Sequence, residues 1–461
     1  MPKKKTALTI EERLQQALVP VEEQPYEVPE NWVWTYISSG FDVTSSKRVH
    51  KSDWLSEGIP FYRTRELVKL SEQGYVDNEL FISEDLYKTF KKEFGVPQKN
   101  DLLISGVGTI GVPYVISDEK EFYFKDGNVI WLKNKGVFDA SYMYYLYKTV
   151  FIDNQIHSMS AGTTVDTYTI INAKNTIIPL PPLSEQQRIV ERIEELFAKL
   201  DEAKERLQEV ADSFAVRKAA ILHKAFTGEL TKQWRRENGV SDESWEEKKL
   251  EEVCSKITDG THNSPTNSLS GEYMYVTAKN IKDTGIDLSN ITYVTKEVHK
   301  EIYSRCDVIY GDVLYIKDGA TAGIATINTL KEEFSMLSSV ALIRTDLKLA
   351  KNEFVKDYLN YRKKEILKNI SGSAITRLTL SKIKDILIPL PTLPEQHEIV
   401  RLIDDLLARE RAAQQAAEQA LASIDLMKKS ILARAFRGEL GTNKASEASA
   451  LELLRQVLAE N

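Results

Sequence analysis

Two glycine-rich loops contain the residues of this chain that come closest to a catalytic site. They are Ser105-Gly-Val-Gly-Thr-Ile-Gly111 in the first half and Lys317-Asp-Gly-Ala-Thr-Ala-Gly323 in the second. A phosphate-binding loop needs glycines for close backbone approach and a final lysine followed by serine or threonine, and neither loop ends that way. The first loop is the nearest look-alike, and it is interpreted either as a tight β-turn or as a loop that lies close to DNA.

The other residue types that carry chemistry are scattered along the chain. The six histidines form no metal-ligand cluster, and Cys254 and Cys306 lack the Cys-x-x-Cys spacing of a zinc or redox site. The Asn/Asp-Pro-Pro-Tyr/Phe signature of amino-methyltransferases is missing as well. The sequence therefore predicts no catalytic residue, no metal and no cofactor. A self-contained DNA methyltransferase or nuclease with unrecognised motifs stays open as the alternative.

Polar and basic side chains gather in loops after the expected strands, at corresponding places in the two halves. Arg63 and Arg65 offer bidentate contacts to guanine or phosphate, whereas the aligned stretch 276–280 offers a lysine and an asparagine. Two domains that read different DNA sequences would differ in this way. For any single residue an ordinary solvated loop is the alternative. The candidate DNA-binding residues are Lys47, Arg48, Arg63, Arg65, Thr163, Thr164, Thr258, His262, Asn263, Lys279, Asn280, Lys317, Thr376 and Arg377.

Two blocks of sequence occur twice, and they locate the elements that must position these loops. Residues 177–190 return at 387–400 with nine of 14 positions identical, and residues 218–230 return at 428–440 with eight of 13 identical. Both copies follow their originals by 210 residues, so no residue has been gained or lost between the blocks. Constant length in a segment of divergent sequence indicates a rigid helix, because loops tolerate insertions and packed helices do not.

Each of these spacers is expected to be one long helix, the first from Ser184 to Phe226. Capping boxes are expected at Ser184 with Gln187 and at Thr392 with Glu395. The apolar residues alternate in steps of four and three, as in the seam of a coiled coil, so we expect an antiparallel helical pair. The seam residues are Ile189, Ile193, Leu196, Leu200, Ala203, Leu207, Val210 and Phe214 in the first helix and Ala413, Ala417 and Ala420 in the second.

The composition is that of an ordinary globular protein. The 461 residues are 42% hydrophobic and 28% charged, which predicts two or three domains with an ample core. No apolar run is long enough for a membrane span, and the N-terminus lacks the apolar core of a secretory signal, so the expected location is the cytoplasm. The net charge of −7 argues mildly against a nucleic-acid binder. Because local fields decide binding, DNA affinity would need a basic face or a helper subunit.

The repeat extends into the globular segments, where residues 58–64 align with residues 271–277 at an offset of 213. Short apolar strands separated by Gly, Asp and Asn turns, with one aromatic-rich helix at 140–154, predict an α+β fold with a mostly β core. We therefore expect two pseudo-symmetric globular domains separated by two long antiparallel coiled-coil-like helices. The expected segments are an N-terminal arm with a short helix (1–27), a first globular domain (28–182), a first spacer helix (183–230), a linker (231–243), a second globular domain (244–392), a second spacer helix (393–440) and a C-terminal helix (441–461).

The repeated blocks resemble those of one family, the DNA-specificity subunits of type I restriction–modification systems. The resemblance rests on Pro179-Leu-Pro-Pro-Leu-Ser-Glu-Gln186, on Ala225-Phe-Thr-Gly-Glu-Leu230 and on their copies at 389–396 and 435–440, and it spans essentially the whole chain. It implies a non-catalytic subunit of a host-defence and DNA-methylation system.

The same resemblance implies how such a subunit works. Each globular unit would be a target recognition domain that reads one half of a bipartite double-stranded DNA site. The helices would set the half-site spacing and hold two methyltransferase (modification) subunits, and restriction/translocase subunits would join this core. The terminal segments would come together and mimic the link at 231–243.

Overall fold

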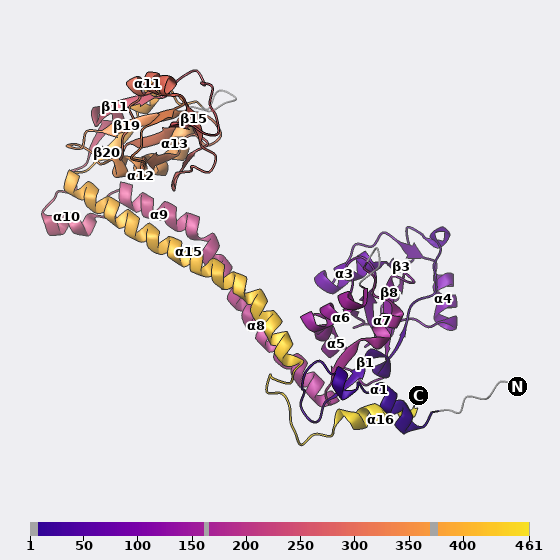
Figure 1. Ribbon diagram of the computed structural model, residues 1–461. Helices are drawn as coiled ribbons and strands as arrows, with labels where there is room; N and C mark the ends of the chain where they lie inside the picture. Colours follow the sequence, from indigo (N-terminus) through magenta and orange to yellow (C-terminus); the bar gives the residue numbers. More distant parts are fainter. Residues whose placement is uncertain (1–7, 161–165, 369–376, 461) are drawn as a thin grey trace. The chain divides into compact units, whose positions relative to one another are not determined.

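The computed structural model describes residues 8–160, 166–368 and 377–460 (Figure 1). The chain forms two compact units, Met1–Arg206 with Ala420–Asn461, and Leu207–Gln419. Two long helices, α8 (Leu183–Asp212) and α15 (Leu393–Ala435), each contain residues of both units. Within the described residues no helix is both long enough and apolar enough to cross a membrane.

The globular part of the first unit is built on two small sheets. One has four antiparallel strands in the order β2-β8-β5-β6, and the other has three strands in the order β4-β3-β7, with β3 parallel to β7. A separate pair, β1 with β9, joins the beginning of this part to its end. The strands are β1 (Val33–Tyr36), β2 (Phe41–Thr44), β3 (Ile59–Tyr62), β4 (Phe81–Ile82), β5 (Leu102–Ser105), β6 (Pro113–Val115), β7 (Tyr123–Phe124), β8 (Val129–Asn134) and β9 (Ile177–Leu180). The helices are α1 (Ile10–Ala17), α2 (Ile37–Gly40), α3 (Thr64–Gln73), α4 (Glu84–Glu93), α5 (Ala140–Tyr147), α6 (Val150–Ser160), α7 (Ile170–Asn175) and, at the C-terminus, α16 (Ala450–Glu460).

The second unit repeats this plan. Its four-stranded sheet has the order β11-β19-β16-β17, its three-stranded sheet has the order β15-β12-β18 with β12 parallel to β18, and β10 pairs with β20. The strands are β10 (Glu246–Lys249), β11 (Cys254–Asp259), β12 (Tyr273–Val276), β13 (Ile281–Lys282), β14 (Gly285–Ile286), β15 (Thr292–Val294), β16 (Val313–Ile316), β17 (Ala325–Ile327), β18 (Phe334–Met336), β19 (Val340–Thr345) and β20 (Leu387–Leu390). The helices are α9 (Phe214–Phe226), α10 (Lys232–Asn238), α11 (Lys296–Arg305), α12 (Asn352–Tyr361), α13 (Lys363–Lys368) and α14 (Leu380–Lys384). The matching strand orders confirm the predicted repeat of an α+β domain.

The central strands are mostly apolar, which is why they form the core. All four residues of β5 and of β16 are buried, because each of these strands has a neighbour on both sides and is covered on both faces. Strands that are covered in this way need continuous runs of branched and large apolar residues, and both strands have them. Each sheet therefore offers a rigid support for the loops at its ends.

Two expected helices are interrupted in the structure. The spacer from Ser184 to Phe226 divides into α8 and α9 at Ser213, whose hydroxyl donates to the Val210 carbonyl at 3.0 Å. The expected helix at 140–154 divides into α5 and α6 at Thr149, whose hydroxyl donates to the Leu146 carbonyl at 2.6 Å and accepts from the Ile152 N–H at 3.2 Å. In both cases a short polar side chain competes for backbone groups of the helix.

The expected capping boxes are wrong. Ser184 lies inside α8, which begins at Leu183, so it cannot be the N-cap. Glu395 is completely buried, and one of its carboxylate oxygens binds other side chains while the other has no hydrogen-bond partner among the described residues. The seam is only partly correct as well, since Val210 is 40% exposed and Ala413 is exposed, whereas Ile189, Ile193 and Ala417 are buried.

Each copy of the first repeated block contains a buried Glu-Gln pair, Glu185-Gln186 or Glu395-Gln396, that makes equivalent contacts in the two halves. The Gln186 amide accepts from the Asp139 N–H at 2.7 Å and donates to the carbonyls of Val137 and Pro181, each at 3.0 Å. Gln396 makes the corresponding bonds to the Lys351 N–H at 2.9 Å and to the carbonyls of Leu349 and Pro391 at 3.0 and 2.9 Å. Each glutamine therefore fastens the start of a long helix to the loop after the last strand of the neighbouring four-stranded sheet.

The two glutamates bind the segments that follow the second repeated block. Glu395 accepts from the Thr231 hydroxyl at 2.7 Å and from the buried Arg235 guanidinium at 2.6 Å. Glu185 accepts from the Trp32 indole at 2.7 Å, from the Asn443 amide at 2.8 Å and from the Thr442 hydroxyl at 3.3 Å. In this respect the C-terminal segment takes the place of the link at 231–243, as predicted.

The terminal segments lie together in the first unit, which confirms that part of the prediction (Figure 1). Leu14 and Ala17 of α1 belong to the same apolar core as Ala450, Leu454 and Val457 of α16. The Thr9 side chain caps α1 in a complete capping box with Glu12. Arg188 of α8 binds both carboxylate oxygens of Glu447, at 2.9 and 2.7 Å, and holds the connection to α16.

Arg235→Ala is expected to lower the free energy of unfolding of the second unit by about 3–5 kcal/mol. The substitution leaves Glu395, which is fully buried, without its cationic partner, and an uncompensated buried charge costs that much. Urea unfolding of the full chain measures the effect. Arg236→Ala, at the next and exposed position of α10, is the matched control, and equal unfolding midpoints for the two variants would contradict the role given to Arg235.

Candidate nucleic-acid interface

In the first unit the loops that carry the candidate residues meet at Asn128, just before β8. Its carbonyl oxygen accepts hydrogen bonds from the Gly106 N–H at 2.8 Å and from the Thr64 hydroxyl at 3.3 Å. The Gly106 carbonyl in turn accepts from the Tyr168 N–H at 2.9 Å. Gly106 must be glycine here, because a Cβ would lie 2.8 Å from the Tyr168 carbonyl oxygen. Ser45 joins the same cluster by donating to the Val129 carbonyl at 2.7 Å.

The second unit has the same arrangement around Ser339. Its carbonyl oxygen accepts from the Lys317 N–H at 2.9 Å, and its hydroxyl accepts from the Ala278 N–H at 3.3 Å. The Lys317 carbonyl accepts from the Leu378 N–H at 2.8 Å, as the Gly106 carbonyl does from Tyr168. The candidate loops of each half thus come together at one end of its sheets. Mostly backbone groups hold them there.

The hydrogen-bonding register corrects the alignment of the two halves by one residue. Tyr62 accepts a backbone bond from Lys125 after β7, and Val276 accepts the same bond from Leu337 after β18. The offset here is therefore 214 rather than 213, and it pairs Arg65 with Lys279 and Glu66 with Asn280. The last pair has one role in both halves, because each side chain accepts the backbone N–H three residues earlier, at 2.9 and 3.0 Å. We call Glu66 and Asn280 the anchor residues.

In the first unit the anchor is an ion-pair centre. The Glu66 side chain is 4% exposed and binds Arg63 through two bonds, at 3.1 and 2.8 Å. Arg65 donates to Glu66 at 2.5 Å and to Glu79 at 2.6 Å, and its side chain is 58% exposed. Arg63 therefore helps to close the turn, and because its side chain is still 28% exposed, its contact with DNA stays a prediction. Arg65 is the arginine that is more accessible to a ligand.

In the second unit the anchor is a neutral amide. Asn280 is buried, its side-chain oxygen accepts from the Thr277 N–H and hydroxyl, and its nitrogen donates to the Asp287 carbonyl at 3.2 Å. Its polar atoms are therefore engaged inside the domain, and its contact with a base stays a prediction. Lys279, the counterpart of Arg65, is exposed beside it.

Lys317, another of the DNA-binding candidates, is also buried, and its contact with DNA stays a prediction. Its ammonium lies 3.4 Å from Asp259 and 3.2 Å from Asp318, and its side chain is 3% exposed. Asp259 also accepts from Arg305 at 2.5 Å, and the Arg305 guanidinium is 3.1 Å from the His262 ring. Because Asp259 is itself buried, the acid fixes Lys317 inside the domain and holds Arg305, which is half exposed, at the surface.

The other candidates lie in varied surroundings. Lys47 is exposed with its ammonium 5.0 Å from the centre of the Phe94 ring, and Arg48 lies 3.6 Å from Asp126 with a side chain that is 72% exposed. Asn263 and His262 are exposed in the loop after β11, whereas Thr258 lies within β11 and is partly buried. Arg377 is exposed and 3.5 Å from Asp318. Thr163, Thr164 and Thr376 lie outside the described residues.

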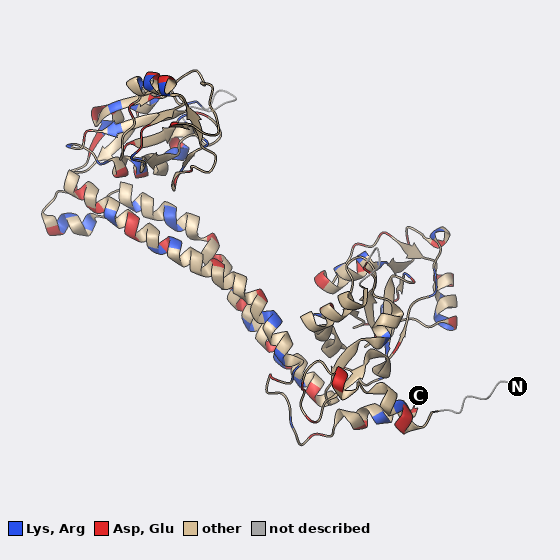
Figure 2. Ribbon diagram, in the orientation of Figure 1, with Lys and Arg blue, Asp and Glu red and all other residues tan. Residues whose placement is uncertain are grey.

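The sequence analysis missed two groups of basic residues. Arg305 was overlooked because it ends a helix rather than occupying a loop after a strand. The second group comprises Arg362, in the turn between α12 and α13, and Lys382 of α14, which line one cavity of about 350 Å³ together with Glu365 and Asp385. The run Arg-Lys-Lys at 362–364 is the signal that could have found it. Lys and Arg elsewhere are interspersed with Asp and Glu, as along α8 and α15 (Figure 2).

The described residues offer little for catalysis. They contain no group of three or more His, Cys, Asp or Glu side chains that could hold a metal ion. Burial raises the pKa of Cys254 and of Cys306 to about 12, so both thiols are poor nucleophiles. Residues 106–111 have Gly-x-Gly-x-x-Gly spacing after β5, but the chain continues into the antiparallel strand β6 rather than into a helix. A dinucleotide site needs that helix N-terminus, so the loop does not form one.

Comparisons with known proteins agree with this arrangement. The model of the family described as "Type I restriction modification DNA specificity domain" matches residues 29–212 and 242–420. The chain is 25% identical over 448 residues to the EcoBI specificity subunit of Escherichia coli, covering 92% of this chain and 90% of that protein. It is 26% identical to the EcoKI specificity subunit of Escherichia coli K12, covering 70% and 72%. The crystal structure of the HsdS subunit from Thermoanaerobacter tengcongensis has the same fold, with a TM-score of 0.66 at 21% identity over 91% of this chain and 100% of that one.

Glu66→Gln is expected to reduce stability in a manner that depends on pH. Burial tends to raise the pKa of Glu66, but bonds from Arg63 and Arg65 outweigh it and lower that pKa from 4.5 to about 2. A depressed folded-state pKa stabilises the protein above the unfolded value, and this stabilisation is lost as the pH falls. The difference in unfolding free energy between wild type and variant should therefore shrink between pH 4.5 and 2. A difference that does not change over this range would contradict the ion-pair role, and Glu72→Gln, at an exposed position of α3, is the control.

Proposed function

Because the chain belongs to the type I restriction–modification DNA-specificity family, we propose that its two globular domains each read one half of a bipartite double-stranded DNA site. The family model matches the chain twice, and each match contains one complete set of the equivalent sheets. The readers would be residues 28–182 and 244–392. The observation that carries the proposal is the pair Arg65 and Lys279. These exposed cations occupy the same place beside the two anchor residues and differ in hydrogen-bonding chemistry.

A second part of the proposal concerns spacing and assembly. The constant length between the repeated blocks, and the continuous course of α15 over 43 residues, support a helical spacer that sets the distance between half-sites. Two methyltransferase subunits would dock on the spacer, one on each repeat, and restriction/translocase subunits would join that core. Arg188 binds Glu447 within the first unit, so we do not include it in the proposed docking face.

Equivalent apolar side chains on the spacer support docking of two copies of one partner. Val216 on α9 and Leu426 on α15 are 210 residues apart, the offset of the repeated blocks. They are 70% and 66% exposed. Large apolar residues that project from two equivalent helix positions favour an interface that is used twice.

Arg65→Ala is expected to weaken recognition of one half-site, and Lys279→Ala to weaken recognition of the other. A lost bidentate contact to a base costs about 1–3 kcal/mol, or up to about a hundredfold in affinity, at one half-site only. A lost phosphate contact instead weakens binding to all sequences and lowers the salt slope by about one. The measurement is binding of the assembled complex to duplexes that are altered in one half-site at a time, with the site taken from the methylome of cells that carry the complex.

Two controls accompany that measurement. Arg236→Ala, an exposed arginine outside both candidate interfaces, should leave both half-sites unaffected. If Arg65→Ala and Lys279→Ala disturb the same half-site, the two-reader proposal fails. The chain purified without partners should leave DNA unmethylated and uncut, and modification by the chain alone would favour a self-contained enzyme instead.

Val216→Asp and Leu426→Asp are each expected to remove one methyltransferase copy from the complex. A carboxylate in an apolar interface must be desolvated without a partner, which costs several kcal/mol. Mass measurement of the co-expressed complex should give two methyltransferase copies per chain for wild type and one for each variant. Leu347→Asp, at a residue that is 71% exposed in the turn after β19, is the control. A wild-type ratio of 1:1, or equal losses in all three variants, would exclude this docking arrangement.

A further inference from the structure

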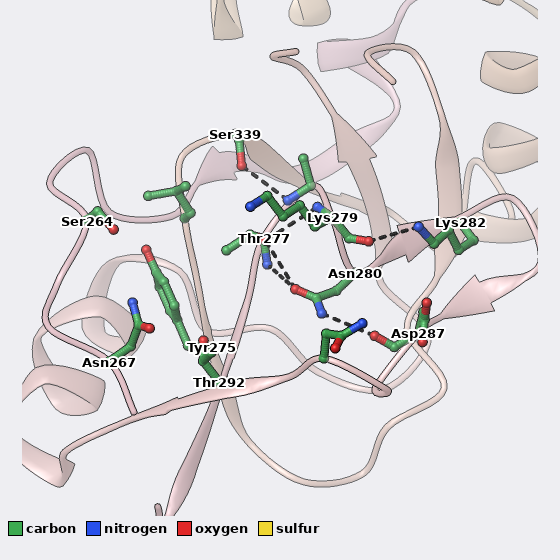
Figure 3. Close-up of a pocket in the computed structure, with 13 residues that line it drawn as sticks. Ser264, Asn267, Tyr275, Thr277, Lys279, Asn280, Lys282, Asp287, Thr292 and Ser339 are labelled. Atoms are coloured by element: carbon green, nitrogen blue, oxygen red, sulfur yellow. Dashed lines mark hydrogen bonds between the residues drawn. The ribbon is translucent and has the colours of Figure 1, made fainter. Parts of the chain in front are cut away.

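The second recognition domain contains a cavity of about 670 Å³ beside Lys279 (Figure 3). Its walls come from the loop after β11, from β12 and the turn that follows it, from the segment 287–292 and from residues 337–339. The volume is within the range of sites that bind small molecules. Ser339, which organises the candidate interface, is one of the lining residues, so the cavity belongs to the same end of the domain.

Tyr275 of β12 is the most unusual residue in this cavity. Its side chain is almost completely buried, and its hydroxyl makes no hydrogen bond of normal geometry with any described residue. Burial raises the pKa of Tyr275, and the nearby Ser264 hydroxyl only partly offsets that rise. Figure 3 shows the hydroxyl end of the ring directed toward Ser264, with Asn267 alongside. A buried polar group without a well-formed hydrogen bond is costly, so a ligand that bonds to it would recover that cost.

The first recognition domain has no such group at the equivalent position. The corrected register places Phe61 of β3 where the second domain has Tyr275, and Phe61 is fully buried in an apolar cluster. The ring alone therefore meets the packing needs of this strand. Tyr275 differs from Phe61 by its hydroxyl, and this hydroxyl lines the cavity.

The remaining lining is polar but mostly uncharged, and it suits a nucleobase. Asparagine, serine and threonine side chains offer both donors and acceptors, which the edge of a base requires. Leu337 and Ala278 supply apolar surface for its faces. The cations are Lys279, in the turn after β12, and Lys282, in β13, and Asp287 is the acid that lines the cavity with them. A phosphate attached to the base could lie beside the two lysines. The polar uncharged residues that line the cavity are Ser264, Asn267, Thr277, Asn290, Thr292 and Ser339, with Asn280 as the buried anchor.

We propose that this cavity is a nucleotide subsite that binds a single nucleobase, with the Tyr275 hydroxyl bonded to the base edge and Lys279 and Lys282 at its phosphate. The proposal rests on the DNA-reading function of this domain, since Lys279 belongs to both. The nucleotide has two possible sources, a base that leaves the stack of the bound duplex and a free mononucleotide. Extrusion of a base by the second domain alone gives the two readers different modes of recognition, because the first has phenylalanine at this position.

The test uses Tyr275→Phe, which keeps the buried ring, and Thr292→Val, which keeps the branched shape in the strand. In one arm each of the four deoxynucleoside monophosphates is titrated against the full chain by calorimetry. In the other arm the assembled complex binds its duplex site with a fluorescent base analogue at each position of one half-site in turn. Tyr310→Phe, at a residue that is 63% exposed and does not line the cavity, is the matched control.

An extruded base predicts a strong rise in fluorescence at one position of the half-site read through Lys279. That rise should be lost in Tyr275→Phe and Thr292→Val, with about a tenfold lower affinity for the duplex, and kept in the control. A free nucleotide predicts instead that one monophosphate binds about tenfold more weakly to both variants, with no fluorescence rise. Either result supports the subsite.

The proposal is overturned if neither arm depends on Tyr275 and Thr292 while the variants keep the wild-type unfolding midpoint. If the wild-type complex still distinguishes both half-sites in that case, the bipartite reading function stands and only the subsite falls. If the complex shows no half-site preference at all, the reading function fails. In that case the calorimetric titrations with the four monophosphates still test the subsite, because they do not depend on recognition of the duplex.

Discussion

The buried Glu-Gln pair at the start of each long helix is the constraint on which the domain architecture depends. A carboxylate with no exposure to solvent must find donors, and the donors of Glu185 and Glu395 lie far from them in the sequence. Both find them in segments that follow the second repeated block, including Thr231 and Arg235 for Glu395. The adjacent glutamine binds the globular domain through three backbone groups. One dipeptide therefore joins helix, domain and returning chain, and a change to either residue would disturb all three.

The sequence predicted the repeat, the strands and the helical spacers, because these follow from periodicity and from constant length. It did not predict the break at Ser213, since one serine in an otherwise helical pattern gives no signal strong enough to end a helix. The capping boxes were wrong for a different reason. A Ser/Thr-x-x-Glu/Gln pattern is typical of a solvent-exposed helix start. In the structure Glu395 instead binds Thr231 and Arg235, which are distant in the sequence.

The grouping of the candidate interface was predictable, but the exposure of its members was not. In an antiparallel sheet the loop after one strand lies at the same end as the loop before its neighbour, and the loops around Asn128 and Ser339 meet in this way. Whether a polar residue in such a loop faces outward depends on partners that are distant in the sequence. Lys317 is buried because Asp259, 58 positions earlier, is buried beside it. Arg305 is held at the surface by the same acid, although nothing in its own sequence neighbourhood indicates an interface.

The choice of anchor residue also determines the charge that each reader presents. Glu66 is ionised and shares its charge with Arg63 and Arg65, so the field of Arg65 is partly neutralised before any ligand arrives. Asn280 closes the corresponding turn with a neutral amide, and Lys279 beside it keeps its full charge. An oriented guanidinium favours directional contact with a base edge, whereas a free ammonium favours a phosphate. Because backbone bonds also hold both turns in place, the anchor and the cation beside it can change as a pair without disturbing the sheets.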